Sequence, residues 1–254
     1  MASNLTIVLS TGSFCTPAAY AQPFAALTSQ GYEFHIPQLL TAGKKPGPLP
    51  NLADDTAMLS ALITKLADED KDILLLAHSY GGTPASESIK GLSKAEREKA
   101  GKKGGVVRLG FMTSLVPPIG VTAGALMADA RSGYQAIDGD GWLYLPDLAL
   151  AGQIVFSSLP PEEATKEVAN FVQHSPLCFA SELTYAGYKD VPVSYLFCEK
   201  DECVPPSVQQ AGIDMIEKES GNAVDVTRFP CDHVPSVTAP EKVVDWILAT
   251  AAKC

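Results

Sequence analysis

A short apolar run followed by small residues constrains the fold of this chain more than any other feature. Residues 73–76 are four consecutive apolar residues, typical of a strand buried on both faces of a parallel sheet. Residues 77–87 then read Ala-His-Ser-Tyr-Gly-Gly-Thr-Pro-Ala-Ser-Glu, whose small residues can open a helix. The positions two before and two after the serine must be small, and they are Ala77 and Gly81. The pattern predicts that Ser79 lies on a strained strand-to-helix turn with its hydroxyl displayed above the sheet.

Short β-rich runs alternate with helical stretches over most of the chain. The predicted strands are 5–10, 32–36, 73–77, 106–112, 192–198 and 223–229. The predicted helices are 17–30, 52–68, 80–90, 93–101, 206–219 and 240–252. This alternation predicts an α/β fold with a mostly parallel sheet, helices on both faces, and ligands bound beyond the carboxyl ends of the strands.

Residues 117–188 break the alternation. They begin with two prolines, contain no predicted strand, and read as short helices and loops that carry several aromatic residues. An insertion of this size between two strands is expected to lie over the sheet edge as a cap. Most of its aromatic side chains should pack the cap onto the core, and the others could line an apolar pocket. The predicted organisation is an α/β core of residues 1–116 and 189–254 with the cap inserted.

A displayed serine hydroxyl needs a base to become a nucleophile, and the chain has only four histidines. His233 lies in the loop after the last predicted strand, at the sheet edge where Ser79 is expected. His78 adjoins the serine, so its side chain is expected to point elsewhere. His35 lies in or at the end of an early strand, and His174 lies in the cap. His233 is therefore the predicted base.

The base in turn needs an orienting acid from another loop on the same edge. Asp201 is the preferred candidate because it follows the fifth predicted strand and precedes a turn into the next helix. Glu199, Glu202 and Asp232 stay open as alternatives, since the sequence does not show which carboxylate faces His233. Surface charge explains the two glutamates better.

Hydrolysis of an ester also needs backbone donors for the oxyanion of the tetrahedral intermediate. The N–H of Tyr80, directly after the serine, is the first candidate. The second should come from the loop after the first strand, where Gly12 permits a sharp turn. The N–H of Ser13 is the preferred donor there, with that of Phe14 as the second choice.

Composition excludes several function classes. The 254 residues carry a net charge of -10, which argues against binding to nucleic acid. No apolar run reaches the roughly 18 residues of a membrane span, and no signal-peptide pattern opens the chain, so a cytoplasmic location without membrane attachment is expected. The six cysteines form no C-x-x-C pair and should be reduced. Cys198, Cys203 and Cys231 with His233 match no common zinc module, so neither metal nor cofactor is expected.

The motifs together resemble the α/β-hydrolase superfamily, and more narrowly its branch of plant-type methylesterases and hydroxynitrile lyases. They are Ala77-His78-Ser79-Tyr80-Gly81-Gly82, Lys200-Asp201 and Asp232-His233-Val234-Pro235. The order serine, acid, histidine is the order expected of an α/β-hydrolase. The resemblance implies an α/β-hydrolase fold of about six mostly parallel strands with an inserted, mainly helical cap.

Two positions discriminate within that branch. Its lyases carry a lysine directly after the catalytic histidine, and this chain has Val234, which favours the esterases. Its esterases usually have His-Gly in the oxyanion loop, and this chain has Thr11-Gly12.

The predicted function is a serine hydrolase that cleaves a small, fairly apolar carboxylic ester, lactone or thioester through an acyl-enzyme on Ser79. Two alternatives stay open. One is a C–C or cyanohydrin-type lyase or a cyclase in which the same triad moves protons, and the other is a non-catalytic ligand-binding protein on a hydrolase fold. The expected partner is a small-molecule ester-like substrate. The sequence leaves the oligomeric state open, with a homodimer as one option.

Overall fold

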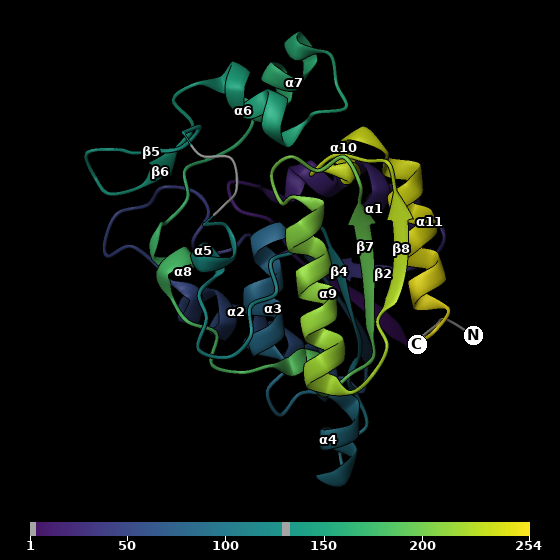
Figure 1. Cartoon of the computed structure of the whole chain (residues 1–254). Coiled ribbons are helices and arrows are strands. Elements are labelled where there is room, and N and C mark those ends of the chain that lie inside the picture. The colour runs from purple at the N-terminus through teal and green to yellow at the C-terminus, as the bar shows by residue number, and fades with distance from the viewer. Residues whose placement is uncertain (1–3, 129–132) are drawn as a thin grey trace.

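A six-stranded sheet forms the centre of the computed structural model, which describes residues 4–128 and 133–254 (Figure 1). The strand order is β2-β1-β3-β4-β7-β8, and every neighbouring pair is parallel. The strands are β1 (Leu5–Ser10), β2 (Glu33–His35), β3 (Asp72–His78), β4 (Gly105–Met112), β7 (Val193–Cys198) and β8 (Asp225–Phe229). The predicted sheet of about six mostly parallel strands is confirmed.

Helices cover both faces of this sheet, which explains why its central strands are nearly continuous apolar runs. Alternate residues of β3 point to opposite sides. Leu74 and Leu76 pack in one apolar cluster with α1 and α11, whereas Ile73 and Leu75 pack in the other with α2, α3 and α9. The helices are α1 (Ala21–Ser29), α2 (Leu52–Asp68), α3 (Gly82–Ser88), α4 (Lys94–Lys99), α9 (Pro206–Ser220) and α11 (Pro240–Ala251).

Two predicted helices begin with a tighter 3-10 turn. The predicted helix 17–30 consists of η1 (Pro17–Tyr20) followed by α1, and the predicted helix 80–90 consists of η2 (Ser79–Gly81) followed by α3. A short helix that the sequence did not reveal, α10 (Pro235–Thr238), follows His233 directly.

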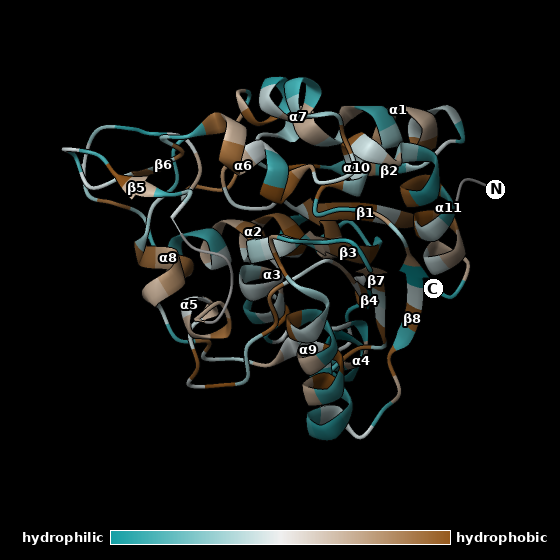
Figure 2. Ribbon diagram, turned by 45° about the horizontal axis from the view of Figure 1, so that its top comes forward, coloured by the Kyte–Doolittle hydropathy of each residue, from teal (hydrophilic) through white to brown (hydrophobic). Residues whose placement is uncertain are grey.

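The chain leaves the sheet after β4 and returns to it at β7, and residues 117–188, called the inserted segment below, lie between. Its described part contains α5 (Ala123–Leu126), α6 (Leu148–Val155), α7 (Pro161–Val168) and α8 (Leu177–Ala180), and η3 (Gly187–Lys189) follows at its end. In Figure 1, α6 and α7 lie on the side toward which the arrows of β7 and β8 point. Figure 2 shows mainly hydrophobic residues in β1, whereas α7 is largely hydrophilic.

The expectation that the inserted segment holds no strand is wrong. β5 (Ala136–Ile137) and β6 (Leu143–Tyr144) form a two-residue antiparallel pair. The Asp138 carboxylate accepts hydrogen bonds from the backbone N–H groups of Asp140 and Trp142, and the Asp138 N–H donates to the Trp142 carbonyl. Local side-chain bonding therefore closes this hairpin, and two-residue strands are too short to leave a periodic pattern.

No helix in the described part of the chain combines the length and apolarity that a membrane crossing would need.

Candidate active site

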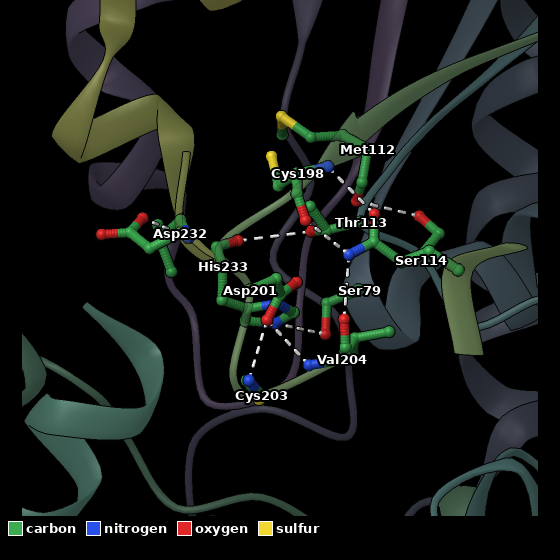
Figure 3. A network of polar contacts seen from close by, with 12 residues as sticks. Ser79, Met112, Thr113, Ser114, Cys198, Asp201, Cys203, Val204, Asp232 and His233 are labelled. Carbon is green, nitrogen blue, oxygen red and sulfur yellow. Dashed lines mark hydrogen bonds and ion pairs between the residues drawn. The ribbon is translucent and has the colours of Figure 1, made fainter. Parts of the chain in front are cut away.

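Three strand-end loops meet at the carboxyl edge of the sheet (Figure 3). Ser79 follows β3, Asp201 lies three residues after β7, and His233 lies four residues after β8. All three side chains are buried. The structure thus brings together the serine, the preferred acid and the preferred base that the sequence offered.

The backbone at Ser79 is strained, with φ at 54°, in the left-handed region that non-glycine residues rarely occupy. Glycine is required two residues after it. A Cβ on Gly81 would collide with the carbonyl oxygen of Ser10 and lie 2.5 Å from that of Thr11. The close approach of the turn to β1 holds the serine in this conformation, and sites of such strain are often functional.

The imidazole of His233 joins the other two side chains. Its Nε2 is 2.9 Å from Oγ of Ser79, and its Nδ1 is 2.7 Å from Oδ2 of Asp201. The other carboxylate oxygen of Asp201 accepts hydrogen bonds from the backbone N–H groups of Cys203 and Val204, both at 2.8 Å. The loop therefore fixes the carboxylate, and the carboxylate fixes the tautomer and orientation of the imidazole.

Two opposing effects act on the pKa of His233. Burial disfavours the charged imidazolium and lowers the pKa, but the negative charge of Asp201 favours it and raises the pKa. Asp201, with a further contribution from Cys203, outweighs burial, so the pKa of His233 is raised well above the usual 6.5.

The rival acids lie elsewhere. Asp232 is fully buried, but it accepts hydrogen bonds from Thr238 and from the N–H groups of Ser158 and Val234. In Figure 3 its carboxylate points away from the imidazole. It ties the loop after β8 to α10 and to the inserted segment. Glu199 and Glu202, by contrast, are exposed.

The other histidines hold no such position. His35 pairs with Glu33 at 3.1 Å on the partly exposed edge strand β2. His174 is buried, and its Nε2 is 3.2 Å from Sγ of Cys178. Both ring nitrogens of His78 make hydrogen bonds to groups other than the serine hydroxyl, namely the Tyr20 hydroxyl and the His233 carbonyl oxygen.

The loop after β1 offers one donor rather than two. The Phe14 N–H donates to Nδ1 of His174 at 3.3 Å, and the Gly12 N–H donates to the hydroxyl of Tyr20 at 2.8 Å. The N–H of Ser13 donates to no acceptor within residues 4–128 and 133–254. Of the two candidates in this loop, Ser13 is the one whose N–H remains available.

Comparison with known proteins establishes the family. The model of the alpha/beta hydrolase family matches residues 7–246. The chain belongs to this family. It is 29% identical over 246 residues to the probable hydrolase R7 of Phoma sp., which covers 96% of this chain and 97% of the relative. A relative of this kind supports a hydrolase enzyme, as the sequence predicted.

Solved structures of the alpha/beta hydrolase family share the fold. A crystal structure of a pyrethroid hydrolase from Sphingobium faniae matches with a TM-score of 0.73 at 20% identity, over 98% of both chains. A methylesterase from Arabidopsis matches with a TM-score of 0.73 at 14% identity, over 98% of this chain and 100% of the other. The predicted resemblance to the superfamily is confirmed, and a plant methylesterase is among its structural neighbours.

A cavity of about 500 Å³ opens at Ser79 in this alpha/beta hydrolase. That volume is in the usual range for small-molecule sites. The polar groups at its floor include Ser13 and Ser79. Its apolar lining includes Leu115, Met127, Ile137, Leu143, Phe179 and Val204.

Sequence reasoning missed most of this lining. Tyr134, Met127 and Leu143 come from the inserted segment, where no periodic pattern marks the residues that face the site. Leu115 lies three residues after the end of β4, and Val204 lies three residues after Asp201. Their position at the carboxyl edge was the one available signal.

The aromatic residues of the inserted segment differ in their surroundings. Phe179 lines the large cavity. Trp142, Phe156 and Tyr188 are fully buried, so they pack the segment onto the rest of the chain.

A second, much smaller cavity of about 20 Å³ is lined by Tyr134, Cys203 and His233, among others. It has room for about one water molecule. The Cys203 thiol borders both cavities and lies 3.6 Å from the Tyr134 hydroxyl. All six cysteines are free, and no cluster of three or more metal-ligating side chains occurs in the part of the chain that the structure describes.

Proposed function

We propose that this alpha/beta hydrolase is a serine esterase that works through an acyl-enzyme on Ser79. The observation that carries the proposal is the hydrogen-bonded series from Ser79 Oγ through the His233 imidazole to the Asp201 carboxylate, at 2.9 and 2.7 Å. A serine held on a strained turn, with a base and an orienting acid in hydrogen-bond reach, is the arrangement that activates a hydroxyl as nucleophile.

In the acylation step, Ser79 Oγ attacks the ester carbonyl carbon while its proton passes to Nε2 of His233. The resulting oxyanion accepts hydrogen bonds from the backbone N–H groups of Ser13 and Tyr80. The imidazolium, stabilised by Asp201, then gives its proton to the alkoxy oxygen as the C–O bond breaks and the alcohol leaves.

Deacylation repeats these steps with water. His233 removes a proton from a water molecule that attacks the acyl carbonyl, and the imidazolium returns that proton to Ser79 Oγ as the acyl–serine bond breaks. The carboxylic acid leaves and the free serine is restored. The net reaction consumes one ester and one water molecule and releases an alcohol and a carboxylic acid.

The cavity indicates an apolar, uncharged substrate. Its described lining residues include six apolar side chains and no lysine or arginine, and the chain carries a net charge of -10. An anionic substrate would therefore find no counter-charge among the described lining residues. Relatives named pyrethroid hydrolase act, by that name, on pyrethroids, which supports a bulky apolar ester.

Val234 supports hydrolysis over cyanohydrin cleavage. It is fully buried and packs among apolar residues of α6 and α7, so no cation follows His233 in the place where the lyases of the resembled branch carry lysine. A leaving cyanide would have no positive charge there to stabilise it.

The proposal is tested with a fluorophosphonate probe and a panel of chromogenic esters of varying acyl length. Wild type should take one probe on Ser79 and hydrolyse the apolar esters, while Ser79→Ala should do neither. Ser86→Ala is the matched control, because Ser86 is a buried serine on the adjoining α3 whose hydroxyl bonds only the Gly82 carbonyl. Absence of labelling in wild type, or equal labelling of Ser79→Ala, would refute the acyl-enzyme.

A further inference from the structure

A buried hydrogen-bonded chain runs behind the serine and contains none of the three triad side chains. Its centre is His78, the last residue of β3, which is 1% exposed. Its Nδ1 is 2.7 Å from the Tyr20 hydroxyl, and its Nε2 is 2.7 Å from the backbone carbonyl oxygen of His233. One imidazole therefore contacts the backbone of the proposed base and, through Tyr20, the loop after β1.

The direction of each hydrogen bond follows from simple chemistry. A carbonyl can only accept, so Nε2 of His78 carries the proton. Burial, together with the nearby His233, lowers the pKa of His78 to about 3, so the ring is neutral and Nδ1 is an acceptor. The Tyr20 hydroxyl thus donates to Nδ1, and its oxygen accepts the Gly12 N–H at 2.8 Å.

Packing ties the same groups together. A Cβ on Gly12 would lie 2.7 Å from Nδ1 of His78 and 3.2 Å from Cβ of Ser79, so the loop fits directly against both. The rings of His78 and His233 lie 4.9 Å apart. Displacement of the His78 ring would therefore disturb the oxyanion loop and the base at once.

We propose that His78 and Tyr20 are positioning residues that hold the loop of Ser13 and the backbone of His233 in register around Ser79. Neither reaches the reacting atoms in the proposed reaction, so they act through the groups they hold. The inference rests on the proposed esterase function, because it assigns a kinetic role to a network that would otherwise be ordinary core packing.

Substitutions of His78 can separate the two hydrogen bonds. In His78→Gln the amide nitrogen replaces Nε2 and keeps the donor to the His233 carbonyl, whereas in His78→Asn the amide oxygen replaces Nδ1 and keeps the acceptor for Tyr20. His78→Leu keeps neither. We expect kcat of His78→Leu to fall on the order of 10²-fold, since misplacement of catalytic groups costs about that much. KM should not change, and each amide should restore part of the loss.

A double-mutant cycle tests whether the two residues act as one unit. Tyr20→Phe alone should lower kcat about tenfold, the effect of losing about one hydrogen bond. In the His78→Leu background it should change kcat less than twofold, because leucine offers Tyr20 no acceptor. Tyr195→Phe is the matched control. It removes an equally buried hydroxyl that donates to the Ser114 carbonyl, and it should keep the wild-type kcat.

The outcomes separate this inference from the proposed function. A wild type that neither labels nor hydrolyses would refute the esterase itself. An active wild type with full kcat in folded His78→Leu, or with additive effects in the cycle, would overturn the positioning role. If His78→Leu does not fold, Tyr20→Phe decides alone, and an unchanged kcat there would overturn it.

Discussion

The strand-end loops and the inserted segment both line the candidate active site, but they are built differently. In the loops, backbone groups hold the functional side chains. Two N–H groups fix the Asp201 carboxylate, and the turn at Gly81 leaves no room for a methyl group. The inserted segment contributes short elements and apolar side chains such as Ile137, which is 62% exposed. The difference suggests that the loops determine the rate of reaction and the inserted segment determines which substrate reacts.

The largest change in kcat should appear when asparagine replaces each of the two buried aspartates of the loops in turn. Asp201→Asn is expected to lower kcat by about 10⁴-fold, because an amide can no longer hold the imidazole in the reactive tautomer. Asp232→Asn should keep kcat within a few-fold and mainly lower the melting temperature, since its carboxylate bonds Thr238 and backbone N–H groups. Steady-state kinetics and thermal melts of both variants provide the check. If Asp232→Asn lost more kcat than Asp201→Asn, Asp232 rather than Asp201 would be the acid that orients His233.

The tight turn should be nearly as sensitive to a single methyl group. Gly81→Ala forces Cβ into the carbonyl oxygens that end β1, at a cost of about 1–3 kcal/mol, and the shifted Ser79 should lower kcat on the order of 10²-fold. Gly212→Ala, in the middle of α9, is the control. The nearest atom to its new Cβ would be the Cβ of Val116, at 3.9 Å. Alanine there should stabilise the protein by up to about 1 kcal/mol. Equal melting temperatures of the two variants would disprove the steric argument.

The sequence could place the loop residues on one edge because parallel strands end there. The apolar run before Ser79 and the loops after the last two strands were enough to bring serine, acid and histidine to the carboxyl edge. The sequence could not decide between Asp201 and Asp232. It depends on which carboxylate the loop backbone turns toward Nδ1 of His233, and both residues are buried acids in strand-end loops.

The remaining features depend on contacts between distant parts of the chain. Tyr20 and His78 are 58 residues apart, and His78 and His233 are 155 apart, so no local pattern could join them. In the described part of the inserted segment, two strands of two residues each and four short α-helices carry too few residues for hydrophobic periodicity to show which side faces the cavity. The sequence could show that this segment lies between β4 and β7, but not which of its residues line the cavity.

The pH dependence of kcat/KM should show the effect of the Asp201 carboxylate on His233. The proposed reaction needs a neutral His233, so kcat/KM should fall as the pH drops through the pKa of this residue. Because Asp201 raises that pKa, the loss should begin above pH 6.5. In Asp201→Asn the raising charge is gone and burial remains, so the acid limb should move to lower pH. Rates of ester hydrolysis between about pH 5 and 9 test this for both proteins, and a wild-type limb below pH 6.5 would contradict it.

The smallest change in rate is expected from the inserted segment, where two phenylalanines can be compared. Phe179 lines the large cavity, so Phe179→Ala should raise KM for bulky apolar esters about tenfold and leave kcat unchanged. Phe156 is fully buried among residues of α6 and α7 and does not line that cavity. Phe156→Ala should therefore cost about 3–5 kcal/mol of stability without changing the preference among esters. The chromogenic ester panel and thermal melts distinguish the two variants. A kcat loss in Phe179→Ala as large as that in Asp201→Asn would contradict the view that the loops set the rate and the inserted segment selects the substrate.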